Sequence, residues 1–232
     1  MIGHMSDDGV LLSILVPTLV ERDEVFARLH ANLSAQIRRN GLVNRVEIDS
    51  LRDNRERTTG DKRNALIASA AGEFIVFVDD DDDVHDDYIA VIASALLMHE
   101  GVDCLGIRGV VDFRGKWPRQ FVHSTRYREY ATRGGVYCRP PYILNPMRRD
   151  IASRFAFADV SYAEDAEWAL RIARAGALQT EHMLEPIVYR YHSRRHWMMQ
   201  AAIDITEPIR RPLGLEFANR VRAGRWLARR RA

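Results

Sequence analysis

One segment of this sequence restricts the possible fold more than any other: an unbroken apolar run that leads directly into a run of acids. Residues 74–78 are Phe, Ile, Val, Phe and Val, and residues 79–83 are five consecutive aspartates. An unbroken run of β-branched and aromatic residues is typical of a strand that is buried on both faces of a parallel sheet. In open α/β sheets, ligands bind at the carboxyl ends of such strands. The segment therefore predicts an α/β fold with a ligand site at the aspartates.

The crowded carboxylates predict a bound cation. Like charges at one strand end repel each other, most strongly where the local dielectric constant is low. A hard divalent ion such as Mg²⁺ or Mn²⁺ relieves this repulsion, and phosphate oxygens of a substrate can complete its shell. The alternative is a solvated acidic loop, which the buried strand before it disfavours. An EF-hand calcium loop is rejected because, counting from Asp79, the sixth position is Val84 instead of Gly and the twelfth is Ala90 instead of Glu.

Strands and helices alternate through the first hundred residues. We expect strands over 11–16, closed by Pro17-Thr18, over 45–51 and over 74–78. Helices are expected after each strand: one that ends at Gly41, one over 58–71, and one that begins at Asp86 with acids in its first turn. Such alternation predicts a parallel, doubly wound sheet.

The pattern is less regular after residue 101. We expect strands over 102–113 and 121–122 on either side of a turn at Arg114-Gly115, and a further strand over 142–144. A helix is expected over 163–175, ending at Gly176. This half of the chain is therefore expected to be mixed rather than strictly parallel.

Composition excludes several classes of protein. The 232 residues are 47% apolar, which is enough for one large domain with a core. The apolar runs are shorter than the about 18 residues of a membrane span, and there is no secretory signal, so a cytoplasmic location is expected. The two cysteines, Cys104 and Cys138, lack the paired spacing of a zinc site and are expected to be reduced.

Two basic residues stand at an unusual place. Lys62 and Arg63 fall near the start of the helix expected over 58–71, where cations oppose the helix dipole. An anionic ligand would explain them, because a helix start with two cations is a phosphate site. The alternative is a pair of exposed side chains on a solvated helix face.

Three segments together carry a resemblance to a known family. They are VPTLVER at 16–22, GDKRNALIASAAGEFIVFVDDDDDV at 60–84 and AEDAEWALRIARAG at 163–176. Over residues 11–191 the chain resembles a family 2 glycosyltransferase with the GT-A fold. The resemblance implies transfer of one sugar from a nucleoside diphosphate sugar, most readily a UDP-sugar, to an acceptor hydroxyl. It also implies that Mn²⁺ or Mg²⁺ bridges the donor diphosphate to an Asp-x-Asp motif.

The resemblance also implies the fold and the domain organisation. We expect a Rossmann-like, doubly wound, mostly parallel sheet with a mixed acceptor-side half. Residues 1–5 look like a cloning remnant, and residues 6–205 are expected to form a single domain. Its nucleotide-binding half covers about 10–100 and its acceptor-binding half about 101–205. Residues 206–232 form an arginine-rich amphipathic segment.

The aspartate run supplies the metal-facing residues that the resemblance implies. These are Asp79, Asp81 and Asp82, with Asp81 preferred, because five aspartates in a row leave the register open. Asp80 and Asp83 flank them, and Asp80 is assigned to the donor-binding set.

The remaining donor contacts come from the first half of the chain. The resemblance places Arg63 near the donor, and Lys62 is grouped with it. An acid near the end of the second strand is expected to hold the nucleobase or ribose. We prefer Asp53 to Asp49, which lies inside the alternating strand pattern, and Thr18 is a second candidate contact. Both could equally be turn residues.

Catalysis is assigned to Glu164 and Asp165. Acids at a helix start are explained by capping and the dipole alone. The resemblance instead makes Asp165 the general base, with Glu164 beside it, and implies inversion at the sugar carbon. His192 lies in a segment where related enzymes carry a His or an Arg-Trp element near the diphosphate, and it is a candidate metal ligand. The segment lacks the Gln-x-x-Arg-Trp spacing of processive synthases, which favours single-sugar transfer.

The acceptor is not identified by the sequence. Trp117 and Asn145 are candidates for lining its pocket, and a glycan, a lipid-linked sugar or a modified nucleic acid could supply the hydroxyl. Residues 210–232 contain eight arginines and one acid, Glu216. This segment could lie on an anionic membrane, contact a polyanion, or pack as a terminal helix on the domain.

Two other functions remain open at this point. A nucleotidyltransferase also uses metal-bound carboxylates on an α/β sheet, but no Gly-rich phosphate loop follows the first strand. A non-catalytic protein that binds a polyanion or a membrane through its arginines is the other alternative, since one fold hosts many functions.

Overall fold

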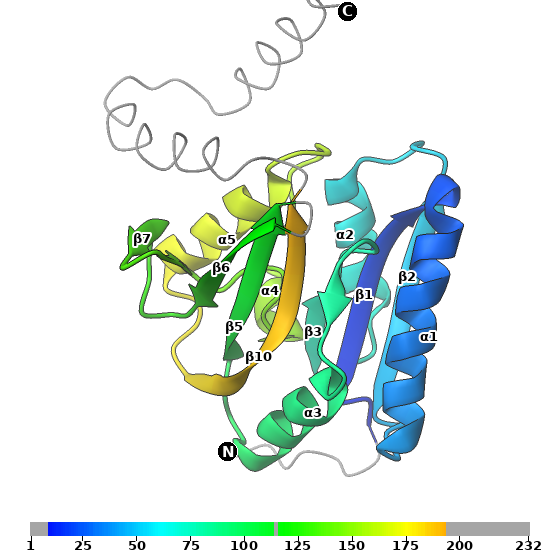
Figure 1. Ribbon diagram of the computed structural model, residues 1–232, viewed down its shortest axis with the longest axis horizontal. Helices are drawn as coiled ribbons and strands as arrows, with labels where there is room; N and C mark the ends of the chain where they lie inside the picture. Colours follow the sequence, from blue (N-terminus) through cyan, green and yellow to red (C-terminus); the bar gives the residue numbers. More distant parts are fainter. Residues whose placement is uncertain (1–8, 114–115, 194–232) are drawn as a thin grey trace, which may run out of the picture. The chain divides into compact units, whose positions relative to one another are not determined.

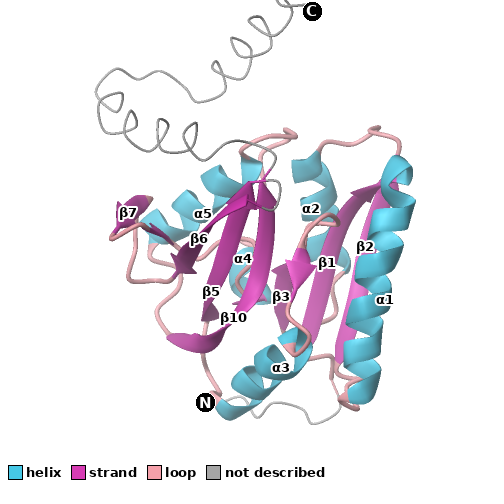
Figure 2. Cartoon of the chain, viewed as in Figure 1, coloured by secondary structure: helices cyan, strands magenta, loops and turns pink. Residues whose placement is uncertain are grey.

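The computed structural model describes residues 9–113 and 116–193, which form one ten-stranded sheet with helices on both faces (Figure 1, Figure 2). The predicted cloning remnant, the turn at Arg114-Gly115 and the arginine-rich segment 206–232 lie outside the described residues. The α/β class expected from the sequence is confirmed.

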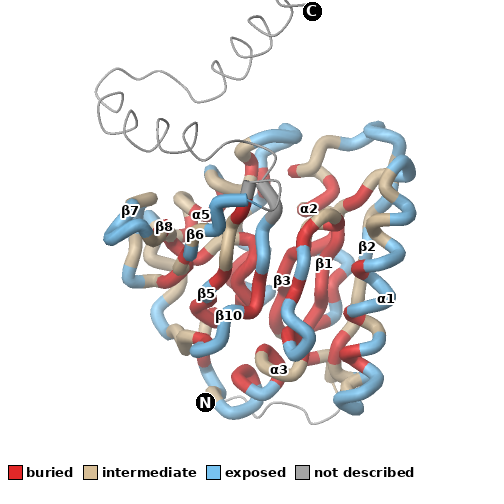
Figure 3. Tube along the Cα trace, viewed as in Figure 1, coloured by how far each residue is buried: buried red, intermediate tan, exposed pale blue. Residues whose placement is uncertain are grey.

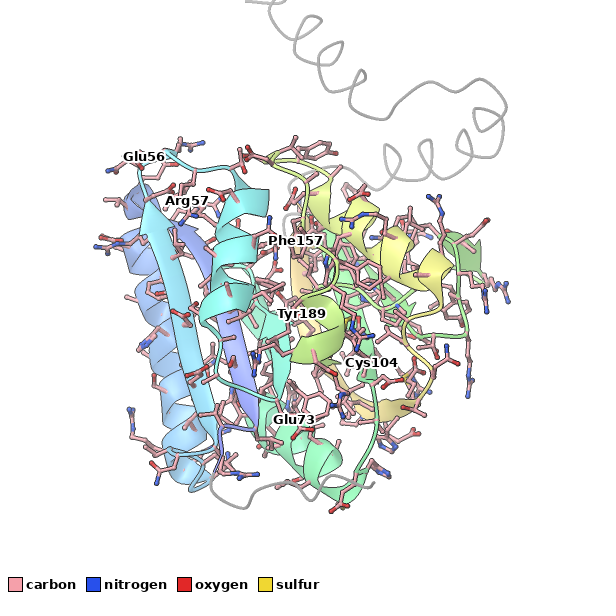
Figure 4. The ribbon with its side chains drawn as sticks, turned by 180° about the vertical axis from the view of Figure 1, so that it is seen from behind. Glu56, Arg57, Glu73, Cys104, Phe157 and Tyr189 are labelled. Carbon is pink, nitrogen blue, oxygen red and sulfur yellow. The ribbon has the colours of Figure 1, made fainter. Side chains whose placement is uncertain are left out.

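The first half of the described chain alternates strands and helices as predicted. Its elements are β1 (Leu12–Leu19), the 3-10 turn η1 (Val20–Arg22), α1 (Asp23–Arg39), β2 (Val46–Asp53), α2 (Thr59–Ser69), β3 (Phe74–Phe77), β4 (Asp83–Val84) and α3 (Tyr88–Met98). Strands β2, β1 and β3 are neighbours in that order and pair in parallel. Helices α1 and α3 cover one face of the sheet and α2 covers the other (Figures 1 and 4). This part is doubly wound.

The second half is mixed, as expected. Its elements are β5 (Cys104–Phe113), β6 (Lys116–His123), β7 (Ala131–Arg133), β8 (Val136–Arg139), β9 (Met147–Arg148), α4 (Arg149–Ala152), α5 (Glu164–Ala175) and β10 (Glu181–Ser193). Strand β9 pairs antiparallel with both β3 and β5 and so joins the two halves into one sheet. Strand β5 pairs antiparallel with β6 and parallel with β10, which also pairs with the short β4.

The central strands are buried because helices cover both faces. All four residues of β3 are buried, and Figure 3 shows buried segments concentrated in the strands with exposed segments at the connections. Helix α1 contributes Leu29, Leu33 and Ile37, spaced by four, and each such buried side chain contributes about 1.5–3 kcal/mol. Cys104 and Cys138 are buried and free, as expected. None of the helices among the described residues combines the length and the apolar composition needed to cross a bilayer.

The strand predicted over residues 142–144 is wrong. These residues form a turn, which the Asn145 side chain closes by accepting the Tyr142 N–H at 2.9 Å. The apolar character of the segment reflects burial in that turn, since Ile143 and Leu144 are both core residues. The strand of this region is β9, a few residues later.

Two predicted boundaries also differ. Strand β1 continues through Pro17 to Leu19, because β3 pairs with it only as far as Leu15 and Pro17 lies opposite Leu51 of β2 alone. Helix α3 begins at Tyr88, so its first turn contains no acid, contrary to the expectation from Asp86.

Candidate functional site

The carboxyl ends of β1, β2 and β3 lie at one edge of the sheet because the three strands are parallel. Thr18 is near the end of β1, and Asp53 is the last residue of β2. The acidic loop, residues 79–83, follows β3. This edge is where ligands bind in open α/β sheets.

Two of the aspartates in the acidic loop face inward and are held by neighbouring side chains. Asp80 is 2% exposed and accepts hydrogen bonds from Thr18 Oγ1 at 2.6 Å and from Arg22 Nη1 at 2.5 Å. Asp82 is 4% exposed and accepts a hydrogen bond from Tyr189 Oη at 2.9 Å. These partners satisfy carboxylates that would otherwise be costly to bury.

Asp79 and Asp81 are partly exposed, with side chains 32% and 30% exposed, and Asp83, which belongs to β4, is exposed. Asp79 accepts a hydrogen bond from Arg63 Nη2 at 3.0 Å, and Asp81 lies 3.6 Å from Arg22 Nη1. The pKa of Asp79 is raised, mainly because the surrounding protein desolvates it. The charges of Asp165 and Asp81 raise it further and Arg63 opposes them.

This arrangement fits a cation that is shared with a substrate. No three His, Cys, Asp or Glu side chains in the described part of the chain gather into a metal cage. Mg²⁺ is usually bound by one or two carboxylates plus substrate phosphates and water, and Mn²⁺ accepts the same oxygen ligands. Asp79 and Asp81 supply that smaller donor set.

Lys62 supports Asp53. Its ammonium group donates to Asp53 Oδ1 at 2.7 Å and to the Thr18 carbonyl at 2.8 Å, and the residue is 4% exposed. Burial opposes ionisation of Asp53, but hydrogen bonds from Lys62 and from the Arg57 N–H outweigh it and lower its pKa. Direct contact of Lys62 with the nucleotide-sugar donor stays a prediction.

Arg63 connects the acidic loop to helix α5. The residue is 2% exposed, so the alternative of two exposed basic residues is excluded for it as for Lys62. Its Nη2 is bonded to Asp79, and its Nε lies 3.4 Å from Glu164 Oε1. The guanidinium carbon lies 4.8 Å from the centre of the Phe77 ring. Its Nη1 is buried and makes no hydrogen bond within the described residues, so the N–H groups of this nitrogen are available to hydrogen-bond an anion.

The start of α5 brings the two predicted catalytic acids to Arg63. Ala163 has φ 64°, a left-handed conformation that is uncommon for a residue with a side chain and is often found at functional sites. Glu164 is 4% exposed, and its pKa is raised to about 7 by burial and by the charge of Asp165, against the effect of Arg63. Asp165 is half-buried and hydrogen-bonds with Tyr142.

The segment before α5 is fastened to α2. Asn64 donates to the Phe157 carbonyl at 3.0 Å and accepts from the Phe157 N–H at 2.7 Å. Phe157, labelled in Figure 4, also stacks on Trp168 of α5, with ring centres 4.7 Å apart. The Gly60 N–H donates to the Val160 carbonyl at 3.0 Å.

Other predicted residues lie elsewhere. Asn145 is 2% exposed and donates to the Leu105 carbonyl, and its assignment to an acceptor pocket stays a prediction. Trp117 is exposed and lines an open groove of about 490 Å³ with Gly134 and Gly135, and its role in acceptor binding stays a prediction. The side chain of His192 lies outside the described residues.

The structure adds three residues that sequence reasoning missed. Arg22, Asn64 and Tyr189 contact the acidic loop or the approach to α5. No local pattern distinguishes them, because their partners are 58 to 110 residues away in sequence.

Only one of the three comparisons with known proteins finds a match, and it concerns the fold. A scan with models of protein families and a search of curated protein sequences find no match. Among solved structures, TarS 1-349 of S. aureus in complex with UDP-GlcNAc matches with a TM-score of 0.55 and 17% identity, over 90% of this chain and 69% of that one. Glucosyl-3-phosphoglycerate synthase from Mycobacterium tuberculosis, in complex with Mn²⁺, UDP and phosphoglyceric acid, matches with a TM-score of 0.50 and 15% identity, over 85% and 76%.

The chain has the GT-A glycosyltransferase fold. The fold expected from the resemblance is thereby confirmed. In this GT-A fold the acidic loop, Asp53 and the start of α5 lie around the carboxyl edge of the parallel strands. At such low identity the likeness establishes the fold, and the chemistry has to be argued from the side chains.

Proposed function

We propose that this chain is a metal-dependent inverting glycosyltransferase. It moves one sugar from a nucleoside diphosphate sugar, a UDP-sugar in the first instance, to an acceptor hydroxyl. One observation carries the proposal: the buried Arg63 lies between the accessible Asp79 of the acidic loop and Glu164, the residue before Asp165. The matched structures are complexes with UDP-GlcNAc and with UDP and Mn²⁺, which supports the choice of donor and of a divalent cation.

The donor is expected to lie along the carboxyl ends of the strands. Asp53 and Thr18 would hold the nucleoside, with Lys62 fixing Asp53. Arg63 has a buried N–H group without a partner among the described residues, and it would face the diphosphate. Arginine is well suited to that task, because its planar fork matches phosphate oxygens.

Asp79 and Asp81 would hold the cation, and Asp80 and Asp82 would hold the shape of the loop. A divalent cation bound there stabilises the negative charge on the departing nucleoside diphosphate. His192 remains a candidate additional ligand.

The chemical step requires a base on the acceptor side. Asp165 removes the proton from the acceptor hydroxyl as that oxygen attacks the anomeric carbon from the side opposite the nucleotide. The bond from the anomeric carbon to the diphosphate breaks, and the sugar is inverted. A positioned base contributes about 10² to 10⁴ in rate. Arg63 contacts both Asp79 and Glu164, and it would fix the position of the donor side relative to the acceptor side.

Two substitutions test the proposal. Asp81→Asn and Asp165→Asn should each abolish release of UDP from UDP-sugars in the presence of Mn²⁺, with the thermal unfolding temperature unchanged. Asp86→Asn is the matched control, because Asp86 is exposed and lies outside the acidic loop. Undiminished turnover in both variants would refute the assignment.

The products separate the alternative functions. Release of pyrophosphate instead of UDP would indicate nucleotidyl transfer. Absence of any Mn²⁺-dependent binding of UDP in calorimetry would favour a non-catalytic protein.

A further inference from the structure

Tyr189 lies beneath the acidic loop and contacts it twice. It is 1% exposed, and its Oη donates to Asp82 Oδ2 at 2.9 Å while accepting the Asp79 N–H at 3.3 Å. One phenol therefore binds both the first and the fourth residue of the loop. A main-chain hydrogen bond from the Asp82 N–H to the Asp79 carbonyl, at 3.1 Å, closes the same span.

The strand that carries Tyr189 is itself fixed to the end of the loop. Tyr189 lies opposite Val84 in the antiparallel pair of β10 and β4, and the His85 N–H donates to the Val188 carbonyl at 3.0 Å. On its other side β10 pairs with β5, with the register shifted between Met183 and Ile187 and between Ile187 and Tyr189. The sheet thus supports the strand that carries the phenol.

The phenol is a dependable donor. It keeps its proton at neutral pH, because the ordinary pKa of a tyrosine is about 10. A hydrogen bond to a charged group is stronger than one between neutral groups. The bond holds Asp82 inward, whereas Asp79 and Asp81 are partly exposed.

We propose that Tyr189 is a positioning residue that fixes the acidic loop in the shape that presents Asp79 and Asp81 to a divalent cation and a nucleoside diphosphate. This inference rests on the proposed function. It adds to it a residue from the last strand of the described domain, more than a hundred residues away from the loop that it orders.

The test compares two buried tyrosines. Tyr189→Phe removes only the hydroxyl group that contacts the loop. Tyr88→Phe is the matched control: its ring packs edge-on against that of Tyr189, with centres 6.4 Å apart, and its buried hydroxyl makes no hydrogen bond within the described residues. Binding of UDP to the full 232-residue chain is measured by calorimetry with Mn²⁺ and without metal.

We expect Tyr189→Phe to weaken Mn²⁺-dependent binding of UDP about tenfold, as for the loss of one charge-assisted hydrogen bond. Metal-free binding of UDP should stay within about twofold, because the nucleoside contacts are on other strands, and Tyr88→Phe should match the wild type in both measurements. Equal Mn²⁺-dependent binding in wild type and Tyr189→Phe would overturn the inference, as would an equal loss with and without metal, which indicates a general packing defect. A wild-type chain that does not bind UDP with Mn²⁺ would overturn the proposed function and this inference with it.

The same contact can be tested from its other end. Asp82→Ala should reproduce the loss, and the double variant with Tyr189→Phe should bind no more weakly than the worse single variant, since both remove one interaction. Additive losses would contradict the inference. If Tyr189→Phe does not fold, Asp82→Ala alone decides: unchanged Mn²⁺-dependent binding overturns the inference, and a metal-specific loss supports it.

Discussion

Lys62 and Lys116 are the only lysines of the chain, and they lie in opposite environments. Lys62 is 4% exposed and paired with Asp53, whereas Lys116 is exposed at the start of β6. Removing one partner of a buried ion pair leaves an uncompensated charge. Lys116 therefore serves as an internal control for the free-energy cost of breaking the buried Lys62–Asp53 pair.

We expect Lys62→Met to lower the free energy of unfolding by about 3 kcal/mol, because it leaves the Asp53 carboxylate without its positively charged partner. Lys116→Met should change it by less than about 0.5 kcal/mol, as is usual for surface substitutions. Denaturant unfolding of both variants measures the difference. The combined variant Lys62→Met with Asp53→Asn should recover part of the loss, and equal stability of the two methionine variants would contradict the role given to Lys62.

Glu164 makes stability depend on pH in a particular direction. Its pKa in the folded chain is about 7, raised from 4.5 by burial and by Asp165. A carboxyl group with a raised pKa binds its proton more tightly in the folded state, so its contribution is fully present below about pH 4.5 and is lost as pH rises toward 7. Relative to Glu164→Gln, the free energy of unfolding should fall by about 3 kcal/mol over this range.

Urea unfolding of wild type and Glu164→Gln at a series of pH values from 4 to 8 measures this loss. The wild type should lose stability relative to the variant between pH 4.5 and 7, and the difference should level off above pH 7. A constant difference across this range would show that Glu164 titrates normally. Subtracting the two curves at each pH removes the contribution of groups that both proteins share.

At the scale of single residues, sequence reasoning succeeded where strand periodicity applied. It preferred Asp53 to Asp49, and the structure places Asp53 at the end of β2 and Asp49 within it, bonded to Ser69. It could not determine which aspartates of the acidic loop face inward. That depends on Tyr189 and Arg22, which reach the loop through the fold and not through the local sequence.

At the scale of elements, the connection from α4 to α5 depends on α2. The two hydrogen bonds between Asn64 and Phe157 replace the main-chain partners that Phe157 lacks in this irregular segment. Gly60 permits the same close approach, because a Cβ atom there would lie 1.9 Å from the Ala158 carbonyl oxygen. Arg63 is on the same helix, so α2 positions both the proposed diphosphate contact and the segment that leads to Asp165.

We expect Asn64→Ala to reduce kcat at least tenfold and to lower the free energy of unfolding by about 1–3 kcal/mol, because it leaves the buried N–H and carbonyl groups of Phe157 unpaired. KM for the donor should change little, since Asp53 and Lys62 are untouched. Asn64→Asp is the comparison variant: it keeps the acceptor for the Phe157 N–H, loses the donor and adds a negative charge beside the Phe157 carbonyl. Steady-state kinetics measure kcat and KM separately. A fall in stability with no change in kcat would mean that the Asn64–Phe157 hydrogen bonds have no part in positioning Asp165.

The alternation of strands and helices was predictable from the sequence up to α3, because each strand and each helix there has its own apolar pattern. The turn at 142–145 and the two-residue β9 were not. Their apolar residues are buried by contacts with β3 and β5, and a two-residue strand is too short to have a period.

At the scale of the whole described domain, residues 143–149 fasten the two halves of the sheet. The Phe77 N–H donates to the Ile143 carbonyl at 2.9 Å, and the Leu105 N–H donates to the Pro146 carbonyl at 2.8 Å. Strand β9 lies between β3 and β5 and pairs with both. The half expected to bind the nucleotide and the half expected to bind the acceptor therefore share main-chain hydrogen bonds, and we expect them to unfold as one unit.

Ligand binding tests this cooperativity. UDP with Mn²⁺ at about 100 times its dissociation constant should stabilise the bound state by about 2.7 kcal/mol. If the halves open together, hydrogen exchange of the most protected amides in β1 and in β5 should slow by the same factor, about 100-fold, although the proposed nucleoside contacts lie on β1, β2 and α2. Mass spectrometry of peptides from the two strands measures both rates in one sample. If hydrogen exchange slows in β1 and not in β5, the two halves do not unfold as one unit. Strand β9 would then be too short to transmit the stability gained at the donor site to the strands on the acceptor side.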